Sequence, residues 1–234
     1  MGRRLPKPAS MANYAETIRK VQAMDDIASH MMPYIPELAL AGALAWGAGL
    51  RLYLVVFLFG LASYLGYWQL PEHLTVLAHP LVLFASGFMT IVELFADKLP
   101  LVDTIWDAIH TFIRIPAGAA LAASVFGDAG AAVTLAAALL GGTLTATTHF
   151  SKASTRAAVN TSPEPFSNAA LSFTEDALVA GGSWLAMSQP VIFLVILALF
   201  VLAALLMLRW IIRGAQRLLR GADDPAGDGP GSPG

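Results

Sequence analysis

Long apolar runs separated by short polar breaks dominate this amino-acid sequence. An α-helix needs about 20 apolar residues to cross the hydrocarbon core of a bilayer. Six runs of roughly this length cover residues 37–67, 76–97, 103–126, 130–150, 167–187 and 189–212. The breaks between them carry proline, glycine or polar residues that are typical of turns and helix starts. The pattern predicts an all-α integral membrane protein with about six transmembrane helices.

The first run is longer than one span needs, and it contains the small residues Gly47-Ala48-Gly49. A helix of this length can tilt in the bilayer or break near such residues. A charged residue followed by small apolar residues also recurs, in segments 50–66, 113–129 and 174–190. This recurrence is consistent with three similar helical hairpins, although any alanine-rich span resembles another.

The composition agrees with a protein that lies mainly in a bilayer. Of the 234 residues, 56% are hydrophobic and 13% are charged, whereas soluble domains carry about 25% charged residues. The chain has no cysteine, which excludes disulfides, thiolate metal ligands and cysteine nucleophiles. No nucleotide-phosphate loop motif is present, so we expect no cofactor, no intrinsic ATP drive and no nucleic-acid partner.

Lysine and arginine are distributed unevenly among the connections between the runs. They precede the first run, follow the second and the fourth, and end the sixth. The connections near 68–75, 127–130 and 188 contain neither residue. A chain that crosses six times with both termini in the cytoplasm satisfies the positive-inside rule at every connection.

Three regions follow from these patterns. Residues 1–36 form a cytoplasmic segment, in which 11–32 is predicted to be an amphipathic helix, solvated or interfacial, on the cytoplasmic face. Residues 37–212 form the transmembrane domain. Residues 213–234 form a tail that is first basic and then disordered.

The most unusual charged segment is ELFADKLPLVDTIWDAIHTFIR, residues 93–114, at the junction of the second and third runs. Glu93 and Asp97 are four residues apart and therefore share one face of a helix. A second stripe, with spacing i, i+4, i+7 and i+11 on the third run, consists of Asp103, Asp107, His110 and Arg114. The two stripes predict a ladder of charge that leads from the cytoplasmic surface towards the bilayer centre.

Charged residues at comparable depth occur on two other runs. Arg51 lies well inside the first run, and Glu175 and Asp176 lie inside the fifth. An unpaired charge at the bilayer centre costs about 3 kcal/mol or more, so we expect Arg51 and Arg114 to pair with Glu175 and Asp176. This group is the predicted solute- or ion-binding site at the midplane. The alternative is a network of ion pairs that only locks the helices together.

The residues nearer the cytoplasmic end allow three interpretations. They are Glu93, Asp97, Asp103, Asp107 and His110. They could cap helices and bond to Lys98, form an entry site for a cation or proton, or form a metal-dependent catalytic site. No compact metal motif such as H-E-x-x-H is present, so we assign no metal.

The longest predicted cytoplasmic connection is THFSKASTRAAVNTSPEPFSN, residues 148–168. Pro163 and Pro165 disfavour a regular helix there, so the connection is either a plain loop or a partly re-entrant gate. Its candidate contacts to a solute or lipid headgroup are His149, Lys152, Arg156, Asn160 and Glu164.

Residues 93–119 and 148–168, followed by Glu175-Asp176, resemble the core motifs of the DUF4126 family. This is a bacterial family of polytopic inner-membrane proteins described only as a domain of unknown function. The resemblance extends over about residues 38–210. It implies a multi-pass protein of the bacterial inner membrane, and it implies no activity.

Three functional hypotheses are compatible with these residues. The first is a small transporter or channel for a small ion or polar solute, in which a desolvated carboxylate could carry a proton as the coupling ion. The second is a metal-dependent hydrolase or transferase for a lipid-linked substrate, using the acids near the cytoplasmic end with His110, His149 and Glu164. The third is a non-catalytic scaffold that docks a partner through its N-terminal helix. The expected partners are the lipid bilayer and a small ion or solute, and so narrow a bundle could form a homo-oligomer.

Overall fold

A computed structural model describes residues 11–97, 100–159 and 165–222, and all of its regular structure is helical. The long helices are α1 (Met11–Met31), α2 (Ile35–Tyr64), α3 (Pro80–Ala96), α4 (Pro100–Val125), α5 (Ala131–Val159), α6 (Pro165–Ser188) and α7 (Pro190–Ala222). Short 3-10 helices lie at η1 (Met32–Tyr34), η2 (Glu72–Ala78) and η3 (Gly127–Ala129). The predicted all-α class is confirmed.

Several helices are long and apolar enough to cross a bilayer. Four segments qualify, at 32–64, 105–125, 131–157 and 190–207, and the bent pair η2 and α3, with 64° between its two parts, would be a fifth. The protein is therefore a multi-pass membrane protein, but six spans are confirmed only in part. Within the described residues α6 does not qualify, because its first half mixes serine, threonine and acidic residues with its apolar ones.

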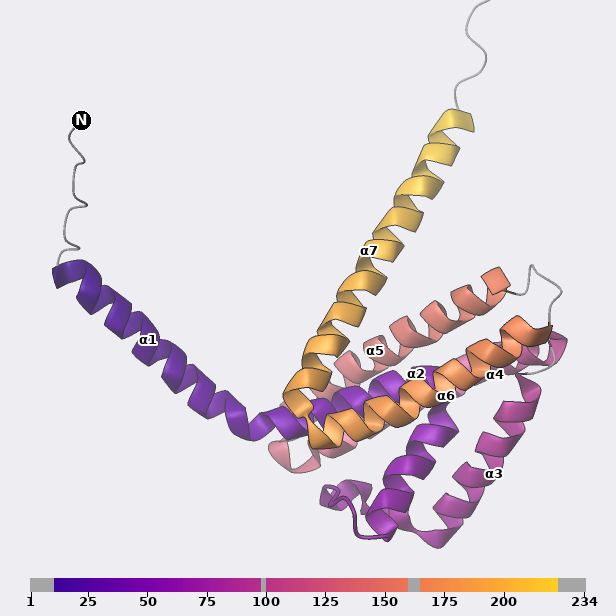
Figure 1. Ribbon diagram of the computed structural model, residues 1–234, viewed down its shortest axis with the longest axis horizontal. Helices are drawn as coiled ribbons and strands as arrows, with labels where there is room; N and C mark the ends of the chain where they lie inside the picture. The colour runs from indigo at the N-terminus through magenta and orange to yellow at the C-terminus, as the bar shows by residue number, and fades with distance from the viewer. Residues whose placement is uncertain (1–10, 98–99, 160–164, 223–234) are drawn as a thin grey trace, which may run out of the picture.

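Helix α2 is the centre of the bundle and packs against α3, α4, α5, α6 and α7 (Figure 1). Its first half buries a succession of alanine and glycine residues, including Ala41, Ala45 and Ala48. Small side chains allow helix backbones to approach closely, which is how helices associate where lipid removes the hydrophobic driving force. The second half contributes larger core residues, Val55 and Phe59, both fully buried.

The regular geometry of α2 is interrupted at Arg51, whose backbone angles (φ −146°, ψ 77°) are not helical. The interruption lies two residues after Gly49, close to the position that the sequence indicated. Glycine and small residues are common at helix kinks because they cost little to bend. In Figure 1 the first half of α2 runs alongside α4, α5 and α6, whereas the second half turns away and descends beside α3.

Close contact between α2 and α5 depends on Gly49. A Cβ atom at this position would lie 2.6 Å from the carbonyl oxygen of Thr145 and 3.1 Å from the backbone nitrogen of His149. We therefore expect Gly49→Ala to lower the free energy of unfolding by about 1–3 kcal/mol, because the backbone of α5 would have to move. Thermal unfolding of the detergent-purified protein measures this.

The matched control is Gly181→Ala on α6, where an added Cβ meets no atom within 4 Å. Alanine forms helix better than glycine by about 1 kcal/mol, so this variant should be as stable as the parent or slightly more so. Equal unfolding temperatures for the two variants would contradict the close packing at Gly49.

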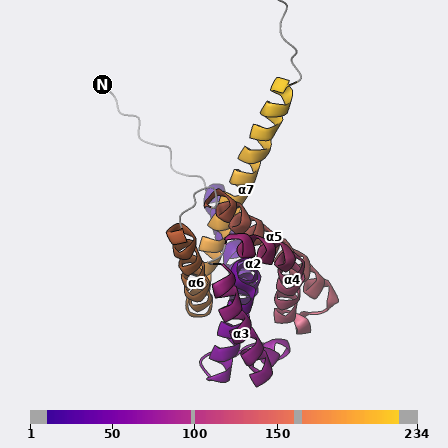
Figure 2. The same ribbon diagram turned by 90° about the vertical axis from the view of Figure 1, so that its right-hand side faces the viewer.

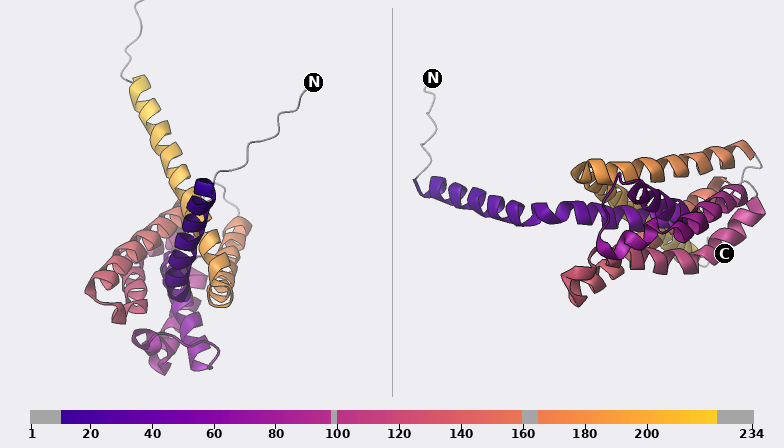
Figure 3. Two further views of the ribbon diagram at one scale, coloured as in Figure 1. Left: turned by 90° about the vertical axis from the view of Figure 1, so that its left-hand side faces the viewer. Right: turned by 90° about the horizontal axis from the view of Figure 1, so that it is seen from below.

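The first and last helices extend away from the bundle. The helix predicted over 11–32 is present as α1, but its described side chains are exposed and it projects beyond α2 instead of packing on the other helices (Figure 3). Helix α7 contacts α2 through its first turns, where Phe193 and Phe200 meet the ring of Trp46, and then stands apart from the bundle (Figure 2). The predicted disordered part of the tail lies largely outside the described residues.

Candidate functional site: an ion network at the break in α2

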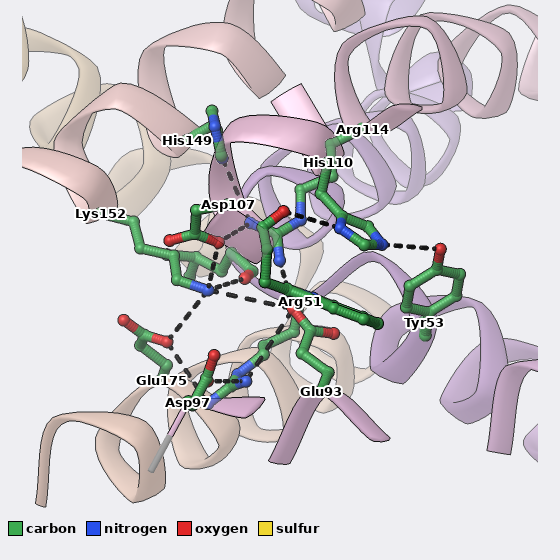
Figure 4. A network of polar contacts seen from close by, with 12 residues as sticks. Arg51, Tyr53, Glu93, Asp97, Asp107, His110, Arg114, His149, Lys152 and Glu175 are labelled. Carbon is green, nitrogen blue, oxygen red and sulfur yellow. Dashed lines mark hydrogen bonds and ion pairs between the residues drawn. The ribbon is translucent and has the colours of Figure 1, made fainter. Parts of the chain in front are cut away.

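Charged side chains from five helices meet around Arg51 (Figure 4). Among the described residues this ion network contains four cations and five acids, namely Arg51, Arg114, Lys152 and Arg156 with Glu93, Asp97, Asp107, Glu175 and Asp176. All except Asp176 are at most 7% exposed, and the Asp176 side chain is 29% exposed. So many buried charges are unusual for helices that cross a membrane.

Arg51 connects α3 to α6. One terminal nitrogen of its guanidinium contacts Asp97, and the other lies 3.4 Å from Glu175 and 2.7 Å from the hydroxyl of Ser172. Its Nε lies 2.9 Å from Asp176. The planar guanidinium carries five donors in a fixed fork, so one side chain can hold acids on two helices at once. The predicted pairing of Arg51 with Glu175 and Asp176 is confirmed.

Arg114 connects α4 to α3, and here the predicted pairing is wrong. Its partners are Glu93, which it contacts directly, and Asp107 at 2.9 Å, rather than Glu175 and Asp176. Asp107 and Arg114 lie seven residues apart on the same stripe of α4, so they align along the helix axis. The predicted division into a midplane site and a separate vestibule is also wrong, because Glu93, Asp97 and Asp107 belong to the same network as the arginines.

Lys152 and Arg156 lie on a helix and not in a loop, because α5 continues to Val159. The Lys152 ammonium donates to the backbone carbonyl of Leu50 at 3.1 Å and lies within 3.6 Å of both Asp107 and Glu175. That carbonyl directly precedes the break in α2. Interrupting a helix frees such acceptors, and a cation satisfies this one.

Arg156 completes the network and connects α5 to α6. It binds Glu175 through two nitrogens, at 3.1 and 2.8 Å, and Asp97 at 3.0 Å. Two parallel bonds between a guanidinium and a carboxylate are the strong, geometrically specific form of ion pair. Arg156 and Arg51 therefore share Asp97 and Glu175.

Two histidines border the network, and their bonds identify the protonated nitrogen of each ring. Nδ1 of His149 lies 3.2 Å from Arg114, which can only donate, so Nδ1 accepts. Nε2 of His149 then donates to the Thr111 hydroxyl at 2.7 Å. In His110, Nδ1 lies 2.8 Å from the Trp106 carbonyl and must donate, so Nε2 accepts from the Tyr53 hydroxyl at 3.1 Å.

Helices α4 and α5 each contribute their residues in one stripe. On α5 the spacing of His149, Lys152 and Arg156 is i, i+3, i+7, which places them on one face. This spacing was visible in the sequence, but the prolines that follow it suggested a loop. Tyr53 and Thr111 were missed altogether. Their only signal was position, since Tyr53 follows Arg51 by two residues and Thr111 follows Asp107 by four.

Three predicted site residues cannot be placed in the network. Asp103 lies in α4, but its side chain is outside the described part of the structure, as are Asn160 and Glu164. The predicted bond of the acids to Lys98 falls on a residue outside the described ranges as well. Among the residues that the structure does describe, no group of three or more histidines and acids is arranged to hold a metal ion.

The fold and the site together define a multi-pass helical membrane protein with a buried ion network at a broken central helix. The family model described as a domain of unknown function, DUF4126, matches residues 38–210, and the chain belongs to this family. The matched region begins in α2 and ends in α7, so it contains every residue of the ion network. No curated protein and no solved structure matches the chain.

Proposed function

We propose that the protein is a small membrane transporter or channel for a small ion or polar solute. The observation that carries the proposal is the ion network itself. Replacing buried ion pairs by apolar residues is often neutral or stabilising, so helix packing alone does not require nine charges. Ionisable residues inside membrane bundles commonly line a path for a solute or proton.

The break in α2 supports the same conclusion. Transporters frequently bind their solutes where a helix is discontinuous, because the interruption presents free backbone groups and charged side chains to a central site. Here the break at Arg51 lies at the centre of the network, with the Leu50 carbonyl facing Lys152.

Two deeply buried atoms of the network have hydrogen-bonding capacity to spare. Oε2 of Glu93 and Nε of Arg114 have no hydrogen-bond partner among the described residues, and both side chains are at most 1% exposed. Buried polar atoms are nearly always paired in native proteins. A polar solute that both donates and accepts hydrogen bonds would suit this position between α3 and α4.

The charge balance fits a proton or cation as the coupling ion. The described network contains one acid more than it contains cations, and Asp176, the most exposed member, lies at its edge. A surplus carboxylate in a bundle of low dielectric constant favours uptake of a positive charge. Asp176 is the acid best placed to exchange that proton with water.

The proposal includes the location and orientation of the chain. Membership of the family supports the bacterial inner membrane, and the lysine and arginine near the ends of α3 and α5 support a cytoplasmic position for that end of the bundle, where the network lies. The start of α2 lies at the other end, because Glu37 lines one pocket with Leu70 and Met187 and another with Asp128. The prediction that the N-terminal segment is cytoplasmic therefore does not fit this orientation. A homo-oligomer stays a prediction.

Glu175→Gln tests the proposed function. A thermal-stability screen of the detergent-purified protein against inorganic ions and small metabolites identifies the solute, because a ligand at 100 times its Kd stabilises by about 2.7 kcal/mol. Glutamine keeps the size of Glu175 but removes the charge that Arg51, Lys152 and Arg156 share. We expect this variant to fold and to lose flux of that solute into liposomes.

The matched control is Glu16→Gln on α1, whose exposed carboxylate pairs only with Lys20 in the described structure. It should transport like the parent protein. Normal flux through Glu175→Gln would contradict the proposed role of the network.

A non-catalytic scaffold is the second candidate, and α1 favours it. Tyr14, Ile18 and Val21 share one face of this helix at spacing i, i+4, i+7 and are 65%, 55% and 51% exposed. An apolar stripe of this kind can dock a partner helix. In that case the ion network would serve packing alone. Neutralising Glu93 and Arg114 together distinguishes this scaffold from a transporter.

A further inference from the structure

An open apolar groove lies on the surface of the bundle between the second half of α2, η2, α3 and α4, with a volume of about 490 Å³. Buried Leu74, Leu77 and Ser86 line its floor, and the Ser86 hydroxyl donates to a backbone carbonyl of its own helix. Leu81 and Ala120 are exposed along its rim. Exposed apolar surface on helices that cross a bilayer contacts acyl chains, so the open side of the groove faces lipid.

The two ends of the groove differ in chemistry. Tyr53 and Met89 line the inner end, and Met89 is one helical turn from Glu93 of the ion network. His73 of η2 lines the outer end and lies 3.1 Å from Asp128 of η3. Asp128 also lines a pocket with the first turn of α2, which is at the end of the bundle away from the network. The groove therefore extends from one surface of the bundle towards its interior, the direction that an acyl chain takes below its headgroup.

The polar pair at the outer end has a defined position. A Cβ atom at Gly127 would clash with the ring of His73, so the ring packs directly on the backbone of η3. The same ring bonds through Nε2 to Oδ1 of Asp128. The Asp128 side chain is 82% exposed, and a carboxylate accepts several hydrogen bonds. Asp128 can therefore bind a further donor at the mouth of the groove.

The charge at the outer end favours a headgroup with a positive group. Connections 68–75 and 127–130 contain the acids Glu72 and Asp128 but neither lysine nor arginine. Anionic headgroups are recognised by clusters of those two basic residues, so this end does not suit an anionic lipid. A primary ammonium group donates hydrogen bonds to a carboxylate, as lysine does, whereas a quaternary ammonium has no N–H to donate. Charge complementarity thus selects a lipid with a primary ammonium group.

We propose that the groove binds one molecule of phosphatidylethanolamine, with an acyl chain along α3 and α4 and the headgroup ammonium at Asp128. Lipid tails are as apolar as the walls of the groove, so the chain fills the groove with little selectivity. The headgroup supplies the preference for one lipid over another. The lipid site lies on the side of the bundle, outside the ion network, and does not depend on the proposed transport.

Native mass spectrometry of the full-length protein in detergent tests the site, because it counts bound lipids. The probes are phosphatidylethanolamine, phosphatidylcholine and phosphatidylglycerol with identical acyl chains. Phosphatidylethanolamine should bind about two- to tenfold more tightly than phosphatidylcholine, the usual effect of one hydrogen bond. Phosphatidylglycerol should bind no more tightly than phosphatidylcholine, because its headgroup is anionic.

Asp128→Asn tests the headgroup contact. Asparagine keeps an oxygen that can accept from His73 but removes the charge that binds the ammonium. The variant should bind phosphatidylethanolamine and phosphatidylcholine equally. The matched control is Asp25→Asn, on the exposed surface of α1, which should keep the preference of the parent protein.

Ala120→Phe tests the chain contact, because a larger side chain at this exposed rim position fills the groove without disturbing the core. It should weaken the binding of all three lipids together. The matched control is Ala203→Phe, at an exposed position on α7 outside the groove, which should bind lipids like the parent protein.

Three results would each overturn the lipid site. They are equal binding of the three lipids by the parent protein, a preference for phosphatidylethanolamine that survives in Asp128→Asn, and equal affinities of the Ala120→Phe and Ala203→Phe proteins. None of these results bears on the flux measured with Glu175→Gln, so the lipid site and the proposed function can fail separately.

Discussion

Arg51→Ala should lower the free energy of unfolding by about 3–5 kcal/mol, the usual result of removing one partner from a buried ion pair. The loss removes the cation paired with Asp176 and one of the two guanidinium groups that Asp97 and Glu175 share, so that only Arg156 still joins those two acids. For a chain of this size the change corresponds to a fall in Tm of about 10 °C. Thermal unfolding in detergent, followed by circular dichroism, measures it.

Two further variants show whether the geometry or only the charge of Arg51 matters. Arg51→Lys keeps the charge, but a single ammonium group cannot reproduce a planar fork that reaches acids on two helices. It should therefore unfold between the parent and Arg51→Ala. Arg209→Ala, on an exposed part of α7, should change stability by no more than about 0.5 kcal/mol. If Arg51→Ala were as stable as Arg209→Ala, Arg51 would not hold the helices together.

Neutralising Glu93 and Arg114 together should restore much of the stability that either single change removes. Glu93→Gln leaves the buried Arg114 with Asp107 as its partner, and Arg114→Gln leaves the buried Glu93 with cations no closer than 3.9 Å, whereas the double variant removes both charges. Charges in one network couple by about 0.5–3 kcal/mol, and the double variant should recover an energy in that range. Unfolding of the four proteins in a double-mutant cycle gives this energy.

The same double variant separates the transporter from the scaffold. If the network binds a solute, the double variant should fold and yet lose the stabilisation by that solute found in the screen. If the protein is a scaffold, the double variant should still bind a partner through α1, because that binding does not depend on a solute. Purely additive destabilisation by the two single changes would show that Glu93 and Arg114 do not act as a pair.

Local sequence patterns were enough to predict most of the helices. The apolar runs located every long helix from α2 to α7, because burial in lipid requires long uninterrupted stretches of apolar residues. The glycines at 47 and 49 indicated the break in α2, because glycine weakens a helix wherever it lies. The predicted number of spans is confirmed only in part. The sequence analysis counted α6 as a span, but the first half of α6 mixes polar and acidic residues with its apolar ones, so the helix does not qualify by hydropathy within the described residues.

The sequence also contained most of the network's members but not its connections. Arg51, Glu93, Asp97, Asp107, Arg114, Glu175 and Asp176 were recognised because charge within apolar runs is rare. The role of Arg114 was misassigned, because depth along a helix does not reveal which neighbour the helix faces. Lys152 and Arg156 were assigned to a loop, because the prolines at 163 and 165 could not show how far α5 continues before them.

The sequence by itself determined the helices, the small-residue packing surface of α2 and the stripe of charge on each span, since these depend on residues within one or two helical turns of each other. Only the tertiary structure decided that Arg51 bridges α3 and α6, that Arg114 pairs with Glu93, and that Tyr53 reaches His110. Those contacts depend on the relative rotation and crossing of helices far apart in the chain. Rotation of one helix by a fraction of a turn would exchange the partners without changing any local pattern.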